Sequence, residues 1–292
     1  MTNSQTGIWT IGKLLQWTSE YLGEHGSESP RLDAEVLLAH CMGCERIELY
    51  TRYDEPASES VRSRFRELVK QRAAGKPVAY IVGKKEFFSL EFEVTPAVMI
   101  PRPDSEFVVI EFLQQFKNRI NPVVADVGTG SGNLAIAAAV QHPGARFYAI
   151  DVSADALKVA QRNAARHNVA DRIEFLQGDL LCPLPESLQC DCIMSNPPYI
   201  PTAQIAQLPV GVREYEPRVS LDGGPTGLEV VARLIDQAGG HLKPGGWIII
   251  EIGAPQEEAV RRLIQRQGIF ELSPTVHDYA GHPRVISARK QS

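Results

Sequence analysis

The sequence predicts an α/β protein: a mostly parallel sheet with helices on both faces, preceded by a smaller helical region. From residue 123 onward, short apolar runs alternate with segments of helical periodicity, which is typical of a doubly wound sheet. The first hundred residues instead show amphipathic helices and then one short stretch with a period of two. A chain of 292 residues is long enough for one large domain and one small domain.

The composition is that of a globular protein, with 43% hydrophobic and 22% charged residues. A net charge of −5 disfavours bare nucleic acid as the main partner. No apolar run approaches the roughly 20 residues that span a bilayer. The first five residues lack the basic and apolar regions of a signal peptide. We therefore expect a cytoplasmic protein that binds no membrane.

The five cysteines are an odd number in such a chain, which disfavours a disulfide framework. Cys41 and Cys44 have a zinc-like spacing and follow His40, but no second Cys or His pair comes after them at finger spacing. We expect buried thiols and no metal. The other three are Cys182, Cys190 and Cys192.

Two helices are indicated in the N-terminal region. One begins at Ser29 and Pro30, as N-cap and first helical residue, and stops at Gly43. The other carries an apolar stripe over 61–72. Its outer face is basic, which is typical of a solvated helix face, with a docking surface for an acidic partner as the alternative. The basic residues are Arg62, Arg64, Arg66, Lys70 and Arg72.

Apolar and polar residues alternate over 88–94, which predicts a half-buried strand. The following segment Ile100-Pro101-Arg102-Pro103-Asp104 predicts a stiff, extended connector, because prolines flank the arginine. We therefore expect a helical domain over 1–84, a β linker over 85–104 and a larger domain over 105–292. The strands expected in the larger domain are 123–127, 147–151, 173–176, 191–195, 247–252 and 285–288, with helices over 134–141 and 154–167.

A glycine-rich loop, Gly128-Thr129-Gly130-Ser131-Gly132, connects the first of these strands to its helix. Its glycines permit a tight turn and a close approach to a ligand at a helix N-terminus. The spacing is G-x-G-x-G, whereas dinucleotide-binding folds use G-x-G-x-x-G. Asp151 ends the second strand, where it could hold both hydroxyls of a ribose or cap the next helix.

Other polar residues follow neighbouring strands. Asp179 follows the third strand, where it could also cap a helix, and Asn196 follows the fourth. Ligands of open α/β sheets bind at the carboxyl ends of the strands. We therefore expect these side chains and Asp151 to converge on one pocket.

Asn196-Pro197-Pro198-Tyr199 is suited to gripping a planar NH2 group. An Asn side chain offers one acceptor and one donor, and the two prolines turn the backbone while showing only carbonyl oxygens. Tyr199 adds a flat ring that could cover the group, or it could be a core aromatic. An ordinary turn at the end of a strand is the alternative for Asn-Pro alone.

Taken together, these motifs resemble the HemK/PrmC family, the S-adenosylmethionine-dependent N5-glutamine methyltransferases of peptide chain release factors. The resemblance covers nearly the whole chain. It is carried by residues 32–35, 75–83, 100–103, 126–132, 151, 196–200, 215–217, 251–253 and 278–281. The chain has Asp104-Ser105-Glu106 where the family usually has Glu-Thr-Glu, and residues 208–212 depart slightly from the family's pattern.

The resemblance implies a class I methyltransferase fold, Rossmann-like, with a mostly parallel seven-stranded sheet, a helical N-terminal substrate-docking domain and a β-hairpin linker. It implies a monomer that acts on the glutamine of a Gly-Gly-Gln motif, with S-adenosylhomocysteine as the product. Asn196 and Tyr199 would be catalytic, with Pro197 and Pro198 also at the substrate. The implied cofactor residues are Gly128, Thr129, Gly130, Ser131, Gly132, Asp151, Asp179, Leu180 and Asn196.

Three alternatives stay open at this point. An adenine-N6 methyltransferase of DNA or RNA would use a similar Asn-Pro-Pro-Tyr loop on a flipped base, although the acidic balance and the small helical region argue against it. A glutamine methyltransferase of a ribosomal protein would be chemically identical. A nicotinamide-dependent or purely cofactor-binding module is opposed by the glycine spacing.

Overall fold

The computed structural model describes residues 8–291, which form two compact units. The first unit ends at Gly83 and also includes the later segment Pro209–Tyr215. The second contains Lys84–Leu208 and the chain from Glu216 onward. The chain therefore passes between the units three times, and the irregular residues 208–212 lie at one of these passages.

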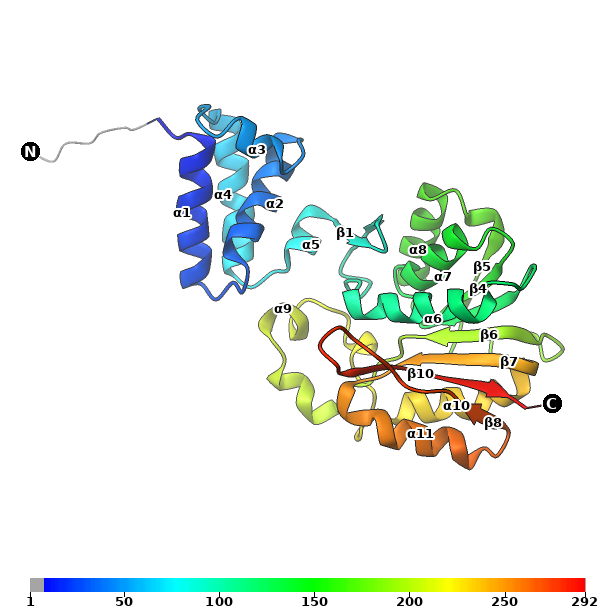
Figure 1. Cartoon of the computed structure of the whole chain (residues 1–292). Helices are drawn as coiled ribbons and strands as arrows, with labels where there is room; N and C mark the ends of the chain where they lie inside the picture. The colour runs from blue at the N-terminus through cyan, green and yellow to red at the C-terminus, as the bar shows by residue number, and fades with distance from the viewer. Residues whose placement is uncertain (1–7, 292) are drawn as a thin grey trace, which may run out of the picture. The chain divides into compact units, whose positions relative to one another are not determined.

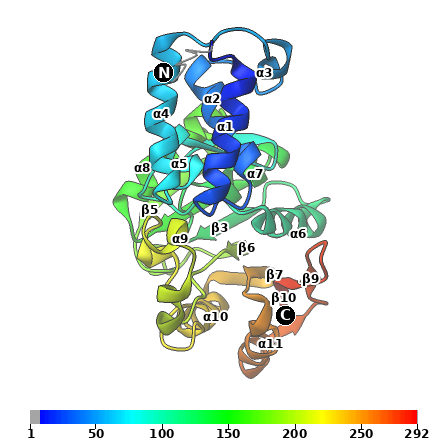
Figure 2. The same cartoon turned by 90° about the vertical axis from the view of Figure 1, so that its left-hand side faces the viewer.

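The first unit is helical (Figures 1 and 2). Helix α1 packs against α2, and α2 packs against α4. Buried side chains such as Leu15, Leu38 and Phe65 fill the space between them. The helices are α1 (Ile11–Glu24), α2 (Pro30–Met42), α3 (Glu48–Thr51), α4 (Glu59–Ala73), α5 (Val78–Val82) and, from the later segment, α9 (Val210–Arg213).

The limits of α2 agree with the prediction, because Pro30 begins it and Gly43 ends it in the left-handed conformation, with φ of 64°. Ser29 occupies the N-cap position, but its side chain makes no capping hydrogen bond. The predicted N-cap and first helical residue are therefore confirmed, with the Ser29 backbone away from the extended conformation, at ψ of 58°. Thr10 and Ser58, in contrast, cap α1 and α4 with their side chains.

The basic face of α4 is largely compensated by neighbouring groups. Arg62 pairs with Glu59, and Lys70 with Glu67 at 2.8 Å. Arg72 pairs with Asp33 of α2 at 2.6 Å. Arg64 contacts Nε2 of His40. These contacts favour the solvated face over the alternative of a docking surface for an acidic partner.

The second unit begins with a hairpin of two antiparallel strands, β1 (Lys84–Phe87) and β2 (Leu90–Glu93). The prediction of one strand over 88–94 is therefore wrong at its start. Phe88 and Ser89 form the turn, with φ of 52° and 59°. Two-residue turns with positive φ are usually signalled by Asn-Gly or Asp-Gly. Phe and Ser give no such signal, so the alternating pattern continues through the turn.

The main sheet has the strand order β5-β4-β3-β6-β7-β10-β8, with β9 paired to β10. Strands β3 to β7 are parallel, and β10 runs antiparallel to β7. All six predicted strands are present, and the short β8 and β9 are additional. The strands are β3 (Val123–Val127), β4 (Arg146–Asp151), β5 (Ile173–Gln177), β6 (Cys190–Ser195), β7 (Leu242–Glu251), β8 (Phe270–Leu272), β9 (Val276–His277) and β10 (Pro283–Lys290).

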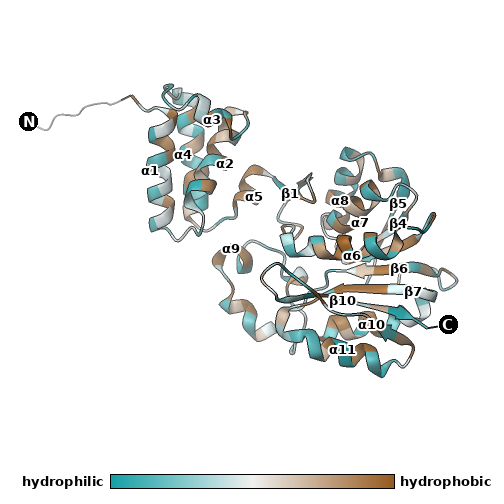
Figure 3. Ribbon diagram, in the orientation of Figure 1, coloured by the Kyte–Doolittle hydropathy of each residue, from teal (hydrophilic) through white to brown (hydrophobic). Residues whose placement is uncertain are grey.

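Helices cover both faces of this sheet, and each face has its own apolar cluster. Figure 3 shows the hydrophobic strand β7 between the two helical layers. On one side lie α6 (Glu106–Phe116), α7 (Asn133–Gln141) and α8 (Ala154–Arg166). On the other lie α10 (Glu229–His241) and α11 (Glu257–Arg266). Within residues 8–291, no helix is long and apolar enough to cross a membrane.

Candidate active site

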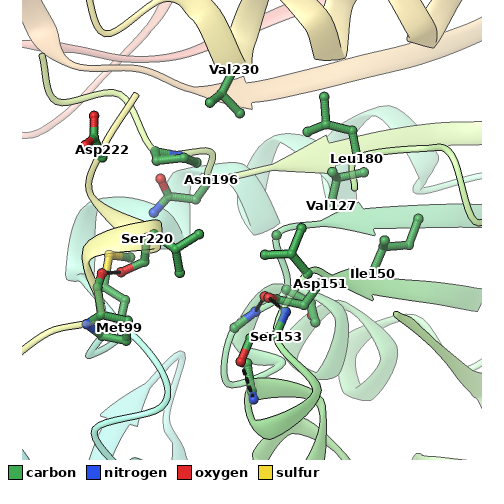
Figure 4. Close-up of a pocket in the computed structure, with 18 of the residues that line it drawn as sticks. Met99, Val127, Ile150, Asp151, Ser153, Leu180, Asn196, Ser220, Asp222 and Val230 are labelled. Carbon is green, nitrogen blue, oxygen red and sulfur yellow. Dashed lines mark hydrogen bonds between the residues drawn. The ribbon is translucent and has the colours of Figure 1, made fainter. Parts of the chain in front are cut away.

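A cavity of about 720 Å³ lies at the carboxyl ends of β3, β4 and β6, and residues of the second unit line it (Figure 4). The neighbouring strands carry Val127, Asp151 and Asn196 to its wall. The predicted convergence of strand ends is therefore present. The predicted residues on the wall are Gly128, Thr129, Gly130, Ser131, Asp151, Asp179, Leu180, Asn196 and Pro198; Gly132, Pro197 and Tyr199 are not among the lining residues.

The glycine-rich loop turns tightly at the end of β3. The N–H groups of Gly128 and Thr129 both donate to the carbonyl of Ile150, at 2.8 and 2.9 Å. Gly132 has φ of 82° and precedes α7. It faces the protein interior, where an added Cβ would lie 2.7 Å from Cδ1 of Ile136. Gly132 therefore shapes the loop without lining the cavity.

Asp126 supports this loop from below. It is fully buried, and its Oδ2 accepts hydrogen bonds from Thr129 Oγ1 at 2.6 Å and from the Ala135 N–H at 3.1 Å. Its Oδ1 has no hydrogen-bond partner within the described part of the chain. Burial raises the pKa of Asp126 to about 7. The side chain ties the loop to the first turn of α7.

Asp151 lies beside the loop at the end of β4. Its Oδ2 accepts from the Gly130 N–H and its Oδ1 from the Ser153 N–H, each at 2.9 Å. The helix-cap alternative does not apply, because Ser153 caps α8 through the Ala156 N–H. Each carboxylate oxygen can accept a further hydrogen bond. Asp151 therefore combines a fixed position with free acceptor capacity at the cavity wall.

Asp179 and Leu180 lie on the wall beyond β5. The Asp179 carboxylate pairs with the guanidinium of Arg233 on α10, and both side chains are about half exposed, at 51% each. No regular helix begins at Asp179, so it is not a cap. Leu180 is a non-glycine residue with φ of 50°, and its side chain lines the cavity (Figure 4). This part of the wall joins one charged pair to an apolar surface.

Asn196 lies on the opposite wall. Its Nδ2 donates to Oγ of Ser105 at 2.9 Å, and within residues 8–291 its Oδ1 makes no hydrogen bond. Pro197 is buried and Tyr199 is partly buried. The Tyr199 hydroxyl lies 3.5 Å from Oε1 of Glu251, and burial raises the pKa of this phenol.

Several residues near the cavity were missed by sequence reasoning. Met99 comes directly before the connector, and Arg233 from α10. Ser105 lies behind Asn196, in the short 3-10 turn Pro103–Ser105 where the sequence departs from the family. Asp222, Gly223 and Gly224 also line the cavity, and this Asp-Gly-Gly run is a turn signal that could have indicated a loop at the site.

None of the five cysteines is among the residues that line the cavity. None of the five forms a disulfide. Cys41 is buried, and burial raises its pKa to about 11. Within residues 8–291, no group of three or more His, Cys, Asp or Glu side chains is arranged to hold a metal ion.

The sheet order, the glycine loop and the acidic residue after β4 define the class I methyltransferase fold. A methyltransferase structure from Pyrococcus furiosus has a similar fold: the TM-score is 0.53 at 19% identity, and the match covers 79% of this chain and 100% of that one. The PrmC N-terminal domain family matches residues 13–83, and the methyltransferase small domain family matches residues 109–208.

Curated relatives extend the match to nearly the whole chain. Release factor glutamine methyltransferases from Rhodopirellula baltica and Moorella thermoacetica are 43% and 44% identical to it. Each match covers 97% of this chain and at least 97% of the relative. The chain belongs to the family of release factor glutamine methyltransferases.

Proposed function

We propose that the protein transfers a methyl group from S-adenosylmethionine to the side-chain amide nitrogen, N5, of the glutamine in the Gly-Gly-Gln motif of peptide chain release factors. The observation that carries the proposal is the position of Asn196. Its Nδ2 is committed to Ser105, so its Oδ1 is left as an acceptor on the wall of the cavity. The names of the curated relatives support this substrate.

The cavity fits the proposed cofactor. Its volume is within the usual range of about 300–1,000 Å³ for small-molecule sites. The glycine loop at the N-terminus of α7 suits the methionine part, and Asp151 has acceptor capacity for the ribose hydroxyls. Leu180 offers an apolar surface for the adenine, with Asp179 beside it for the amino group. When bound, S-adenosylmethionine supplies an electrophilic methyl group and leaves as S-adenosylhomocysteine.

The residues of the chain then have to activate a poor nucleophile, because the nitrogen of a glutamine amide is conjugated. We assign one N–H of the substrate amide to Asn196 Oδ1 and the other to the carbonyl of Pro197, with the Tyr199 ring over the amide plane. These acceptors fix the nitrogen and stabilise the positive charge that develops on it as the N–C bond forms and the S–C bond breaks, before it loses a proton to water. Tyr199 stays protonated at neutral pH, because its pKa is raised, so it does not serve as a base.

The proposal includes a monomeric, cytoplasmic enzyme whose helical first unit docks the protein substrate. An adenine-N6 methyltransferase of nucleic acid is the competing function, because the same loop could hold an adenine amino group. The net charge of −5 and the compensated basic face of α4 support the protein substrate over it.

The test is methyl transfer from labelled S-adenosylmethionine to a purified release factor, to the same factor with its Gly-Gly-Gln glutamine changed to alanine, and to DNA. We expect label in the first protein alone. Asn196→Ala should lower kcat on the order of 100-fold, which corresponds to about 3 kcal/mol, and leave the cofactor Kd within about threefold. Label in DNA, or in the factor without its glutamine, would contradict the proposal.

A further inference from the structure

Asn163 on α8 lies between the glycine-rich loop and the hairpin β1–β2. It is fully buried, at 0% exposure, and it is not among the residues that line the cavity. Its Nδ2 donates to the carbonyl of Ser131 at 2.9 Å and to the carbonyl of Glu93 at 3.1 Å. Its Oδ1 accepts from the Glu93 N–H at 2.8 Å. One buried side chain thus contacts both the loop at the cavity and a strand of the hairpin.

These three hydrogen bonds fix the orientation of the Asn163 amide. An Asn side chain has two N–H donors and one carbonyl oxygen, and each of these groups has a partner here. If the amide were turned over, its oxygen would face two carbonyls and its NH2 group would face the Glu93 N–H. Two acceptors or two donors that face each other are costly where water is excluded. The loop, the helix and the strand are therefore held in one arrangement.

Helix α8 covers the outer edge of β2. Within the described part of the chain, the hairpin sheet consists of β1 and β2, so one edge of β2 has no strand partner for its backbone groups. Asn163 bonds both backbone groups of Glu93, and Nε2 of His167, at the C-cap of α8, contacts the Glu91 carbonyl at 2.9 Å. Arg162 also pairs with the Glu93 carboxylate, at 2.7 Å. The position of the hairpin is thus fixed by α8.

The same helix packs closely against the glycine-rich loop. An added Cβ at Gly132 would lie 3.2 Å from Cβ of Ala160, which is three residues before Asn163 and on the same face of α8. Ser131, whose carbonyl accepts from Asn163, lines the cavity. Residues 97–99, which follow the hairpin, line it as well. Asn163 therefore fixes one part of the cavity wall directly and, through β2, the start of a second part.

We propose that Asn163 is a positioning residue that couples binding of the cofactor at the glycine-rich loop to the position of the hairpin β1–β2. The inference rests on the proposed function for the identity of the cofactor, S-adenosylmethionine. A bound cofactor suppresses fluctuations that open the loop. Because Asn163 joins Ser131 to Glu93, the hairpin is then held more firmly, and a change in the hairpin alters cofactor affinity in return. The hairpin follows directly on Gly83, so the coupling reaches the segment that joins the two units.

The first experiment measures the cofactor Kd by titration calorimetry and the free energy of unfolding by chemical denaturation. It compares Asn163→Ala and the isosteric Asn163→Asp with a matched control, His167→Ala, because the hydrogen bond of His167 goes to β2 and not to the loop. We expect both Asn163 variants to raise Kd at least about tenfold, since the Ser131 carbonyl loses its donor or faces a carboxylate oxygen. His167→Ala should lower the free energy of unfolding and keep Kd within about threefold of the wild type.

The second experiment is hydrogen exchange of the Glu93 amide in the wild type, which tests the coupling even if the Asn163 variants do not fold. The reference is the Ser273 amide, which donates to the Ser287 carbonyl at 3.0 Å, next to β8. We expect saturating S-adenosylmethionine to slow exchange at Glu93 at least about fivefold more than at Ser273. This difference should disappear in Asn163→Ala.

Four results would overturn the inference: equal slowing at the two amides in the wild type, a difference that persists in Asn163→Ala, an unchanged Kd in a folded Asn163 variant, or an equal rise of Kd in His167→Ala. A wild-type protein that binds the cofactor and shows the slowing at Glu93, but transfers no methyl group to a release factor, contradicts the proposed function instead.

Discussion

Asp151 and Gly130 are joined by a hydrogen bond of 2.9 Å, which runs from the backbone N–H of Gly130 to Oδ2 of Asp151. The other oxygen of the same carboxylate accepts from the N–H of Ser153. The two backbone donors belong to the glycine loop and to the start of α8. Asp151 therefore holds two sides of the proposed cofactor pocket together while it lines that pocket.

This relationship makes the isosteric substitution Asp151→Asn informative. An amide would direct its NH2 at one of the two backbone N–H groups, so one donor would be left facing another. We expect Asp151→Asn to weaken S-adenosylmethionine binding by at least about tenfold, nearly as much as Asp151→Ala. Titration calorimetry measures this. Asp155→Asn is the control, because Asp155 is exposed and pairs with Lys158; an equal loss there would contradict the prediction.

The ion pair between Asp179 and Arg233 leads to a second prediction. Exposed pairs of this kind contribute roughly 0–1 kcal/mol, so Asp179 can be released at little cost. If Asp179 binds the adenine amino group, removal of Arg233 frees the carboxylate. We expect Arg233→Ala to leave cofactor affinity unchanged or raise it up to about fivefold, and Asp179→Asn to lower it. A large loss of affinity in Arg233→Ala would show that the arginine itself holds the cofactor.

Substitution by alanine should change the stability of the fold in opposite directions at Gly132 and at Gly240. Gly132 has φ of 82°, and a Cβ there would approach Ile136 and Ala160. We expect Gly132→Ala to destabilise the fold by about 2 kcal/mol. Gly240 lies in α10 with no atom within 4 Å of an added Cβ. Gly240→Ala should stabilise the fold by up to about 1 kcal/mol. Chemical denaturation of both variants measures their free energies of unfolding. A Gly132→Ala variant as stable as the wild type would show that the loop relaxes around the new methyl group and would contradict the prediction.

The Glu251 carboxylate predicts a pH dependence. Burial raises its pKa to about 7, Asp104 adds to this rise, and Arg284, Ser105 and Tyr199 oppose it. Between the ordinary pKa of a glutamate, 4.5, and this raised value, the unfolded chain loses the proton and the folded protein keeps it. We therefore expect the contribution of Glu251 to the free energy of unfolding to fall as the pH rises from about 4.5 to about 7, and then to level off.

The Glu251→Gln variant provides the control for this pH dependence. Its side chain does not titrate, so its free energy of unfolding should depend less on pH between about 4.5 and 7 than that of the wild type. Chemical denaturation of both proteins, in buffers of constant ionic strength between about pH 5 and 8, measures the two profiles. Equal pH dependence in both proteins would assign the titration to another group, such as Asp126.

Much of the larger unit could be predicted because its signals are local. The glycine loop begins where the apolar strand 123–127 ends, and the boundaries of β3 agree with the prediction. Asp151 and Asn196 follow apolar strands in the same way, which was enough to place them at one edge of a sheet. Parallel strands buried on both faces leave this pattern in the sequence.

The parts that were missed depend on distant contacts. Ser105 contacts Asn196, and Arg233 contacts Asp179, but 91 and 54 positions separate the members of these pairs. No periodicity in the chain indicates such contacts. The position of Tyr199 is of the same kind: its hydroxyl faces Glu251, 52 positions away. The turn at Phe88 was missed for a different reason, since its residues are not those that favour positive φ.

The short segment Pro209–Tyr215, which belongs to the helical unit, has a mechanical consequence. It is flanked on both sides by stretches that supply cavity residues, with Thr202 before it and Pro217 to Ser220 after it. Two covalent tethers therefore join the helical unit to the rim of the cavity, in addition to the passage at Gly83. A displacement of that unit would therefore be transmitted along the backbone to the residues that flank Pro209–Tyr215 and line the cavity. A cut at Gly83 alone would leave the two units connected.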